Sequence, residues 1–326
     1  YTKEQYYEKF KNVKILSDDL YNFKSRLMQN TNTKFKNSSI SKNEKELNEF
    51  IKSLGFNTRK NRTLLNGREI DIFLDELNLG IEYNGNFWHG EFFGGKNKNY
   101  HVSKLEECNK NNVSLITIFE DEYVLRKPIV LSKIKHLLNK NESDRIYAKN
   151  CQIRVIDKNI AKIFLDNNHI EGYTSATVHF GAFYEDILVG VMSVTKTKEN
   201  VWEIVRFATL IDKICVGVCG KLFSFFKKNY KYESIISFVD RRLTKDVNNN
   251  LLTKLGFTLE KVNEPRSKYY KSSFDKMKRF NESSFTKTKL INMDSSLSEK
   301  MTKTEMLKKL GFDRIWDCGT FKFVYR

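Results

Sequence analysis

Two acidic side chains on neighbouring predicted strands are the residues of this sequence best suited to chemistry. The segments 69–74 and 79–83 are apolar runs joined by a short turn at 75–78, which predicts a β-hairpin. Pairing centred on this turn places Asp71 opposite Glu82. Side chains directly opposite each other in such a pair have Cβ atoms roughly 4.5–5.5 Å apart, so the two carboxylates should lie close together.

Two like charges at that separation destabilise a sheet unless something neutralises them. A shared proton would do so, and so would a hard divalent cation that prefers oxygen ligands. We expect Mg²⁺, with Mn²⁺ tolerated, held by Asp71 and Glu82 and by the backbone carbonyl of Tyr83. The alternative is an exposed hairpin face with solvated acids, and a register shift of one residue would break the pairing.

Four further polar residues of catalytic type lie on either side of this hairpin in the sequence. Glu44 is on a predicted helix at 44–54, His89 follows two aromatic residues, and His101 and Lys104 share one face of the next predicted helix. In a basic chain, acids surrounded by His and Lys suit the metal-assisted hydrolysis of a phosphodiester, with histidine as general acid or base. A packed histidine without a catalytic role is the alternative for His89.

The same residues carry a resemblance to a known family. Their order resembles the PD-(D/E)XK nuclease core and, more narrowly, its very-short-patch-repair (Vsr-like) branch, which includes phage-encoded homing endonucleases. The similarity covers about residues 41–138. It rests on Glu44-Lys45-x-Leu47, Gly55, Asp71, Glu82-Tyr83-Asn84-Gly85-x-Phe87-Trp88-His89 and Phe119-Glu120-Asp121-Glu122.

This resemblance implies a restriction-endonuclease-like mixed sheet flanked by helices, and Mg²⁺-dependent cleavage of DNA strands. Asp71 and Glu82 match the metal ligands of the family, Glu44 matches the helix acid that positions metal or water, and His89 matches the catalytic histidine. One position departs from the pattern, because Asn84 stands where many members carry Lys. His89 and the lysine of the following helix would then have to supply the missing proton and positive charge.

Residues 147–272 show a different pattern, in which a helix precedes a hairpin, a strand, a Gly-rich turn and another helix. This order resembles GNAT-type acyltransferases, in particular the Mom-like DNA-modification group of phages. A Gly-rich turn that opens a helix offers N–H groups to phosphate, and a tight turn without a ligand is the alternative. Cys219 occupies the place of the second glycine of the family's loop, which argues against acetyl-CoA as a ligand. The candidate residues for a cleft in this part are His169, Arg206, Gly217, Gly220, Asp240 and Arg241.

The charge balance of the chain predicts a nucleic-acid partner. The 326 residues include 57 Lys and Arg against 40 Asp and Glu, a formal net charge of +17, which favours a polyanion such as DNA. A solvated basic face is the alternative for the tail of the chain. The residues expected to contact DNA phosphates are Arg241, Arg242, Lys245 and Arg279.

No run of the sequence approaches the ~18 apolar residues of a membrane span, so we expect no membrane partner. Five scattered cysteines without a CxxC pattern favour a reducing compartment. Together with the resemblance to phage-encoded nucleases, this implies the cytoplasm of a phage-infected bacterial host cell. The sequence leaves the oligomeric state open, a homodimer included.

Together these features predict an α/β protein of four parts. They are an N-terminal helical segment at 1–40, a nuclease domain at 41–140, a GNAT-like domain at 147–272 and a basic extension at 273–326. The main hypothesis is a metal-dependent DNA endonuclease of the homing type. The alternatives are a GNAT-like acyltransferase that modifies DNA, and a DNA-binding protein in which both sites are inactive.

Overall fold

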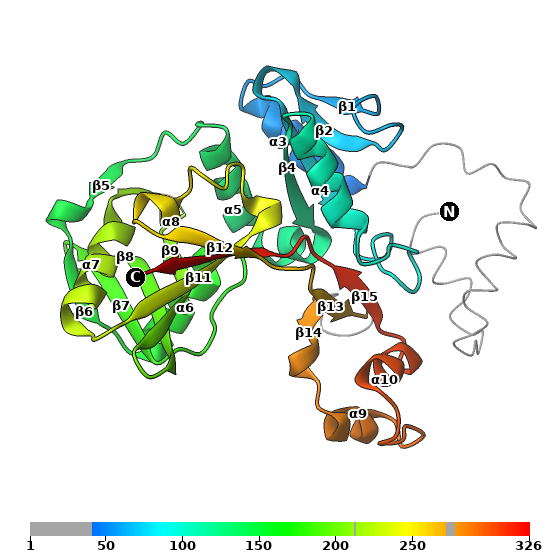
Figure 1. Cartoon of the computed structure of the whole chain (residues 1–326). Coiled ribbons are helices and arrows are strands. Elements are labelled where there is room, and N and C mark those ends of the chain that lie inside the picture. Colours follow the sequence, from blue (N-terminus) through cyan, green and yellow to red (C-terminus); the bar gives the residue numbers. More distant parts are fainter. Residues whose placement is uncertain (1–40, 212, 272–277) are drawn as a thin grey trace, which may run out of the picture.

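The computed structural model describes residues 41–326 apart from 212 and 272–277 (Figure 1). The expected helical segment at 1–40 lies outside the described residues. The described part is a mixed α/β protein whose strands form a four-stranded sheet, a seven-stranded sheet and two small sheets. None of the helices in this part is long and apolar enough to span a membrane.

The four-stranded sheet has the strand order β1-β2-β3-β4. β2 and β3 are antiparallel, as the hairpin pattern predicts, whereas β3 and β4 run parallel because a helix connects them. The strands are β1 (Arg59–Asn61), β2 (Ile70–Leu74), β3 (Leu79–Asn84) and β4 (Ser114–Phe119), and the helices are α3 (Lys42–Ser53), α4 (Tyr100–Lys110) and α5 (Glu120–Leu137).

Helices cover this sheet with two separate apolar clusters, which explains why its strands read as nearly continuous apolar runs. In one cluster Leu47 of α3 and Ile129 of α5 pack with Ile81 of β3. In the other, Leu105 of α4 packs with Phe73 of β2. The three helices thereby fix the hairpin that carries the two predicted carboxylates.

The seven-stranded sheet has the order β12-β16-β11-β9-β8-β7-β6 and is antiparallel except for the pair β9 and β11. The hairpin of β7 and β8 turns at Glu185 and Asp186, which both have positive φ, as a type I′ turn requires. The elements are β6 (Gln152–Val155), α6 (Lys158–Asn168), β7 (Val178–Tyr184), β8 (Ile187–Lys198), β9 (Val201–Thr209), α7 (Val218–Asn229), β11 (Ser234–Asp240), α8 (Leu251–Lys254), β12 (Thr258–Val262) and β16 (Thr320–Tyr325). A separate parallel pair is formed by β5 (Arg145–Tyr147) and β10 (Ile214–Val216).

The parallel strands β9 and β11 are paired over only part of their length. Their register ends with Ile204 opposite Ser237, although β9 continues to Thr209 and β11 to Asp240. Beyond this point each strand pairs only with its other neighbour, β8 or β16. The two strands therefore separate toward their C-terminal ends, and Arg206 lies on the separated part of β9.

Residues 263–319 form an insertion between two strands of the seven-stranded sheet, which we call the inserted segment. β16 follows it and returns to lie between β12 and β11, where it buries Phe323 and Val324. The expected extension at 273–326 is therefore not a separate part, because its last strand completes the large sheet. In Figure 1 helices α9 and α10 of the inserted segment lie in a lobe that projects from the rest of the molecule. The inserted segment contains β13 (Ser267–Tyr270), β14 (Phe280–Asn281), α9 (Lys287–Met293), α10 (Lys303–Lys309) and β15 (Asp313–Trp316).

Candidate active site

The hairpin register is the one that the sequence predicts. Ile72 lies opposite Ile81, and the next position along the hairpin brings Asp71 to Glu82. At this position, hydrogen bonds from backbone N–H groups to the two side chains link β2 and β3. The N–H of Tyr83 donates to Oδ2 of Asp71 at 2.9 Å, and the N–H of Asp71 lies 3.3 Å from Oε1 of Glu82. The two carboxylates are therefore held by each other's strand.

Electrostatics makes this pair unfavourable as two bare anions. Burial, and then the charge of Glu82, raise the pKa of Asp71 to about 8, although the N–H of Tyr83 opposes the shift. Burial also raises the pKa of Glu82, against the opposite effect of Lys104. The ammonium of Lys104 lies 2.6 Å from Oε2 of Glu82 and also donates to the carbonyl of Glu69, and only 6% of Lys104 is exposed.

A third acid and a second lysine stand at the rim of the pair. Glu44 is in the first turn of α3, where the N-cap Ser41 accepts its N–H at 3.0 Å. Lys60 of β1 lies 3.4 Å from Glu44 and 2.5 Å from Glu69. The negative charge of Glu44 contributes to the raised pKa of Asp71, so the structure brings these acids together. Sequence analysis missed Lys60, because β1 has only three residues and no strand pattern.

The two expected histidines meet although they come from different elements. Nδ1 of His89 and Nε2 of His101 are 2.9 Å apart, and the rings stack with centroids 5.1 Å apart. His101 also meets the ring of Phe119 edge-on. Burial, followed by the effect of His101, lowers the pKa of His89 well below its ordinary value, and burial lowers that of His101 to about 3. Both rings are therefore neutral at pH 7.

Asn84 stands on β3 two residues after Glu82, where the resemblance noted in the sequence would place a lysine. It is 1% exposed, and neither atom of its amide group has a hydrogen-bond partner in the described part of the chain. The positive charge beside Glu82 comes instead from Lys104 on α4.

The carboxylate pair has the donor chemistry that Mg²⁺ needs. Within 41–326, less the undescribed positions, no three His, Cys, Asp or Glu side chains gather closely enough to hold a metal ion alone. Mg²⁺ commonly takes only one or two carboxylates from the protein and the rest of its shell from water and substrate phosphate. Asp71 and Glu82 fit that incomplete protein shell, and the raised pKa of Asp71 marks a position where a cation would be stabilising.

In the second half of the chain, two of the six expected cleft residues share one partner. Arg206 lies 3.2 Å from the carboxylate of Glu171, whose N–H donates to His169 at 3.1 Å. Lys268 of β13 lies 2.9 Å from the same carboxylate. Burial and Arg206 lower the pKa of His169 to about 3. Gly217 is the N-cap residue of α7, with a φ of +76°, and Gly220 lies in the first turn of this helix.

Of the four basic residues expected to contact DNA phosphates, three form ion pairs with acidic residues of the protein instead. Arg242 pairs with Glu122 at 2.6 Å and with Asp240 at 2.8 Å, and Arg279 pairs with Glu122 at 2.7 Å. Arg241 pairs with Glu106 at 2.9 Å. Arg242 and Arg279 are buried, so we correct their expected role as phosphate contacts to a role in holding the chain together. Lys245 is exposed.

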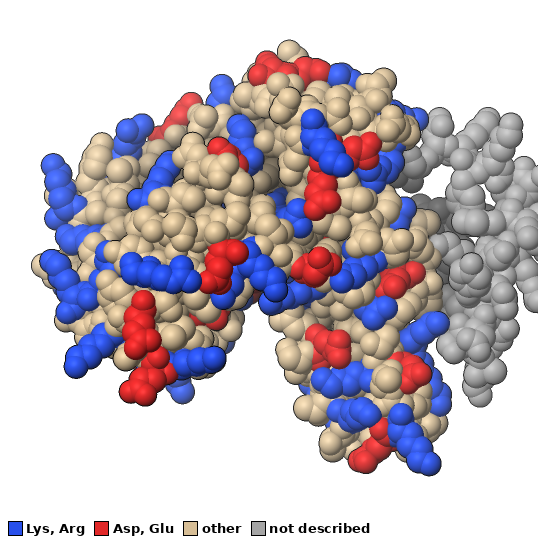
Figure 2. Space-filling view, in the orientation of Figure 1, with Lys and Arg blue, Asp and Glu red and all other residues tan. Residues whose placement is uncertain are grey.

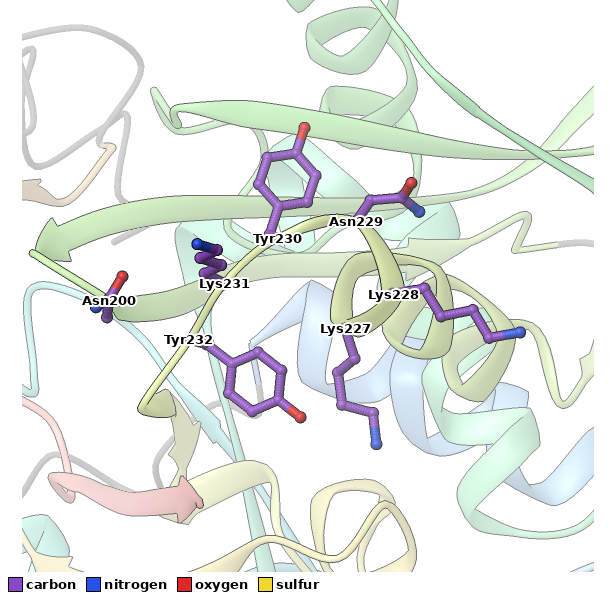
Figure 3. Close-up of a pocket in the computed structure, with 7 residues that line it drawn as sticks. All are labelled: Asn200, Lys227, Lys228, Asn229, Tyr230, Lys231 and Tyr232. Carbon is purple, nitrogen blue, oxygen red and sulfur yellow. The ribbon is translucent and has the colours of Figure 1, made fainter.

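The positive charge of the surface is distributed rather than gathered. Figure 2 shows Lys and Arg side chains over every part of the visible face, mixed with Asp and Glu. A shallow pocket of about 670 Å³ lies at the end of α7 and contains none of the expected site residues (Figure 3). It is lined by Asn200, Lys227, Lys228, Asn229, Tyr230, Lys231 and Tyr232.

Comparison with known proteins finds similarity only to solved structures. No protein-family model and no curated protein match this chain. Among solved structures it is similar to a GNAT family acetyltransferase from Elizabethkingia anophelis with acetyl-CoA bound, at 12% identity and a TM-score of 0.30, over 54% of this chain and 98% of that one. An IAA acetyltransferase from Bacillus cereus (11% identity, TM-score 0.26) and a Bacillus subtilis acetyltransferase in complex with CoA (12%, 0.26) each match 53% of this chain and 97% of their own.

The likeness is therefore to GNAT acetyltransferases, it covers about half of this chain, and it is distant. It is in line with the acyltransferase resemblance of the sequence. None of these three structures is a nuclease, so the nuclease hypothesis has no support from them. At these identities and TM-scores the likeness says nothing of the substrate of this chain.

Proposed function

We propose that this protein is a Mg²⁺-dependent endonuclease that hydrolyses phosphodiester bonds of DNA at the Asp71–Glu82 pair. The observation that supports it is the buried, opposed carboxylate pair beside Lys104, with the pKa of Asp71 raised to about 8. A pair of this kind has no stabilising role by itself, because burial and mutual repulsion both oppose ionisation. It is suited to holding a divalent cation in contact with a phosphate.

The protein residues would divide the work as follows. Asp71 and Glu82, with the backbone carbonyl of Tyr83, would hold Mg²⁺, which when bound supplies charge stabilisation at the phosphate and activates water. Lys104 would compensate the charge of Glu82 and contact a phosphate oxygen. Glu44 at the rim would orient the attacking water or support the cation.

The histidine pair would handle protons. His89 and His101 are neutral at pH 7 and share one hydrogen bond between their rings. Their lowered pKa values make both rings weak bases in the free protein, so proton transfer from the attacking water would require the negative charge of a bound phosphate to raise those pKa values. Because Asn84 cannot carry a charge or deliver a proton, these tasks would fall to His89 and Lys104.

Cleavage of plasmid DNA by an Asp71→Asn variant tests the proposal. We expect a loss of about 100-fold or more in the cleavage rate with Mg²⁺, because one carboxylate of the pair is lost while the shape is kept. Asp75→Asn is the matched control, since Asp75 lies in the turn of the same hairpin and its carboxylate pairs with the exposed Arg59. If Asp71→Asn cleaves at the wild-type rate, the nuclease proposal is wrong.

A second candidate is acyl transfer at the opening between β9 and β11. The feature that favours it is the separation of these strands beyond Ile204, next to the polar group of His169, Glu171 and Arg206. Calorimetric titration with acetyl-CoA tests it, with Arg206→Ala as the variant expected to weaken binding. Absence of heat at millimolar acetyl-CoA would reject this candidate. DNA binding without either activity would leave the non-enzymatic alternative.

A further inference from the structure

One strand of the inserted segment lies directly against the loop that follows His89. β15 begins at Asp313, about 220 residues away from this loop in the sequence. We propose that β15 is part of the nuclease site and that Asp313 positions His89. This inference rests on the proposed function and adds to it a positioning residue from a part of the chain that the family resemblance does not cover.

The carboxylate of Asp313 holds the loop through its backbone. Oδ1 accepts the N–H of Phe92 at 2.7 Å, and Oδ2 accepts the N–H of Phe93 at 3.1 Å. Asp313 is 1% exposed, so these hydrogen bonds form out of water. Hydrogen bonds from N–H groups to a buried carboxylate are among the stronger ones in proteins.

A second set of contacts fixes the same loop from the neighbouring residues of β15. The N–H of Glu91 donates to the carbonyl of Arg314 at 2.7 Å. The side chain of Glu91 accepts hydrogen bonds from Nε of Arg314 at 2.5 Å and from the indole N–H of Trp316 at 2.7 Å. Backbone and side chain of the loop are therefore both tied to β15.

Gly90 shows how closely the two segments approach. A Cβ atom at this position would lie 1.9 Å from Oδ2 of Asp313, so only glycine fits beneath the carboxylate. Gly90 directly follows His89 in the chain. The position of Asp313 therefore restricts the backbone one residue away from the proposed catalytic imidazole.

The inserted segment also reaches the second histidine. The guanidinium of Arg279 lies 3.7 Å from the centroid of the Phe119 ring, and this ring meets His101 with centroids 5.5 Å apart. His101 in turn holds His89 through the ring nitrogens. Both members of the histidine pair are thus supported by residues that come from between β12 and β16.

An Asp313→Asn variant tests this role. An amide can present only one oxygen, so its NH₂ group would face one of the two N–H donors. We expect single-turnover cleavage to fall about 10-fold or more while DNA affinity, measured with Ca²⁺ in place of Mg²⁺, stays unchanged. Asp317→Asn is the matched control, because Asp317 also accepts two backbone N–H groups within the inserted segment but does not touch the loop.

A double variant separates positioning from general weakening of the fold. If Asp313 acts through His89, adding Asp313→Asn to His89→Ala causes no further loss of rate, whereas independent effects would multiply. Multiplying effects, or an Asp313→Asn rate equal to wild type, would overturn the inference.

Hydrogen exchange tests whether Asp313 holds the loop after His89, even if the wild type does not cleave DNA. We expect Asp313→Asn to speed amide exchange in residues 89–93 and to leave β16 unchanged. An inactive wild type would refute the proposed function alone. Unchanged exchange in residues 89–93 would refute the role of Asp313.

Discussion

At the scale of single residues, Asp71 has an environment that only a proton or a cation satisfies. Its carboxylate is held against the strand of Glu82, and burial together with that second charge raises its pKa to about 8. Glu82 has the ammonium of Lys104 as a partner, whereas the carboxylate of Asp71 accepts the N–H of Tyr83 and has no ion pair within the described residues. The two acids are therefore unequal, and Asp71 is the one that would gain most from a metal ion.

This inequality predicts how stability depends on pH without metal. Because the folded pKa of Asp71 lies above its ordinary value of 3.8, the folded state holds the proton more tightly. Stability should fall as pH rises from about 4 to 8, by at most about 1.4 kcal/mol per pH unit from this group. Asp71→Asn should flatten that fall in urea unfolding with EDTA, and Mg²⁺ should restore wild-type stability at pH 8. Equal pH slopes for wild type and variant would contradict this.

At the scale of elements, the first turn of α5 is the meeting point of the large parts of the chain. Glu122 in this turn forms ion pairs with Arg242, which follows β11, and with Arg279 of the inserted segment. Burial opposes the ionisation of Glu122, but the two arginines outweigh it and hold its pKa at about 2. Arg279 also pairs with Asp121 at 2.7 Å, so two acids and two arginines join three segments.

Removal of one arginine from this group should be costly. Arg279→Ala leaves Asp121 without its buried partner, and breaking a buried ion pair in this way costs about 3–5 kcal/mol. Lys162→Ala is the control, because its pair with Asp166 is a partly exposed contact along one helix and is worth about 0.5 kcal/mol. Urea unfolding of both variants measures the difference. A similar decrease in the free energy of unfolding for both variants would mean that the buried ion pairs contribute no more to stability than the exposed one.

At the scale of the whole molecule, the net charge of +17 includes two kinds of Lys and Arg side chains. Some form buried ion pairs within the protein, and others are exposed and could contact DNA. Arg242 and Arg279 are used internally, and the exposed Lys and Arg side chains are spread over the surface (Figure 2). A distributed positive surface binds DNA through its phosphates and with little sequence preference. Such binding does not need the carboxylate pair.

Binding of duplex DNA should therefore weaken steeply with salt. With about 6–10 phosphate contacts, we expect a loss of roughly 10³–10⁵ in affinity between 50 and 200 mM salt. Fluorescence anisotropy with a labelled duplex and EDTA measures this, and Asp71→Asn should bind as tightly as wild type at each concentration. An affinity that hardly changes with salt would contradict a phosphate-dominated interface.

The sequence by itself determined features that depend on local pattern. The two apolar runs and the turn at 75–78 predicted the register that brings Asp71 to Glu82, and β2 and β3 pair in that register. The spacing of His101 and Lys104 correctly placed both on one helix, α4. These outcomes follow from contacts between neighbouring residues, which a single sequence encodes directly.

Only the tertiary structure decided which distant groups meet. The contact of Asp313 with the loop after His89, and the burial of Arg279 against Asp121, join segments about 220 and 158 residues apart. The sequence predicted Arg279 as a phosphate contact on the surface. It is buried because it pairs with Asp121, and no local sequence pattern links these two residues. β16 joins the large sheet for a similar reason, since strand pairing across an insertion is set by the final packing and not by neighbouring residues.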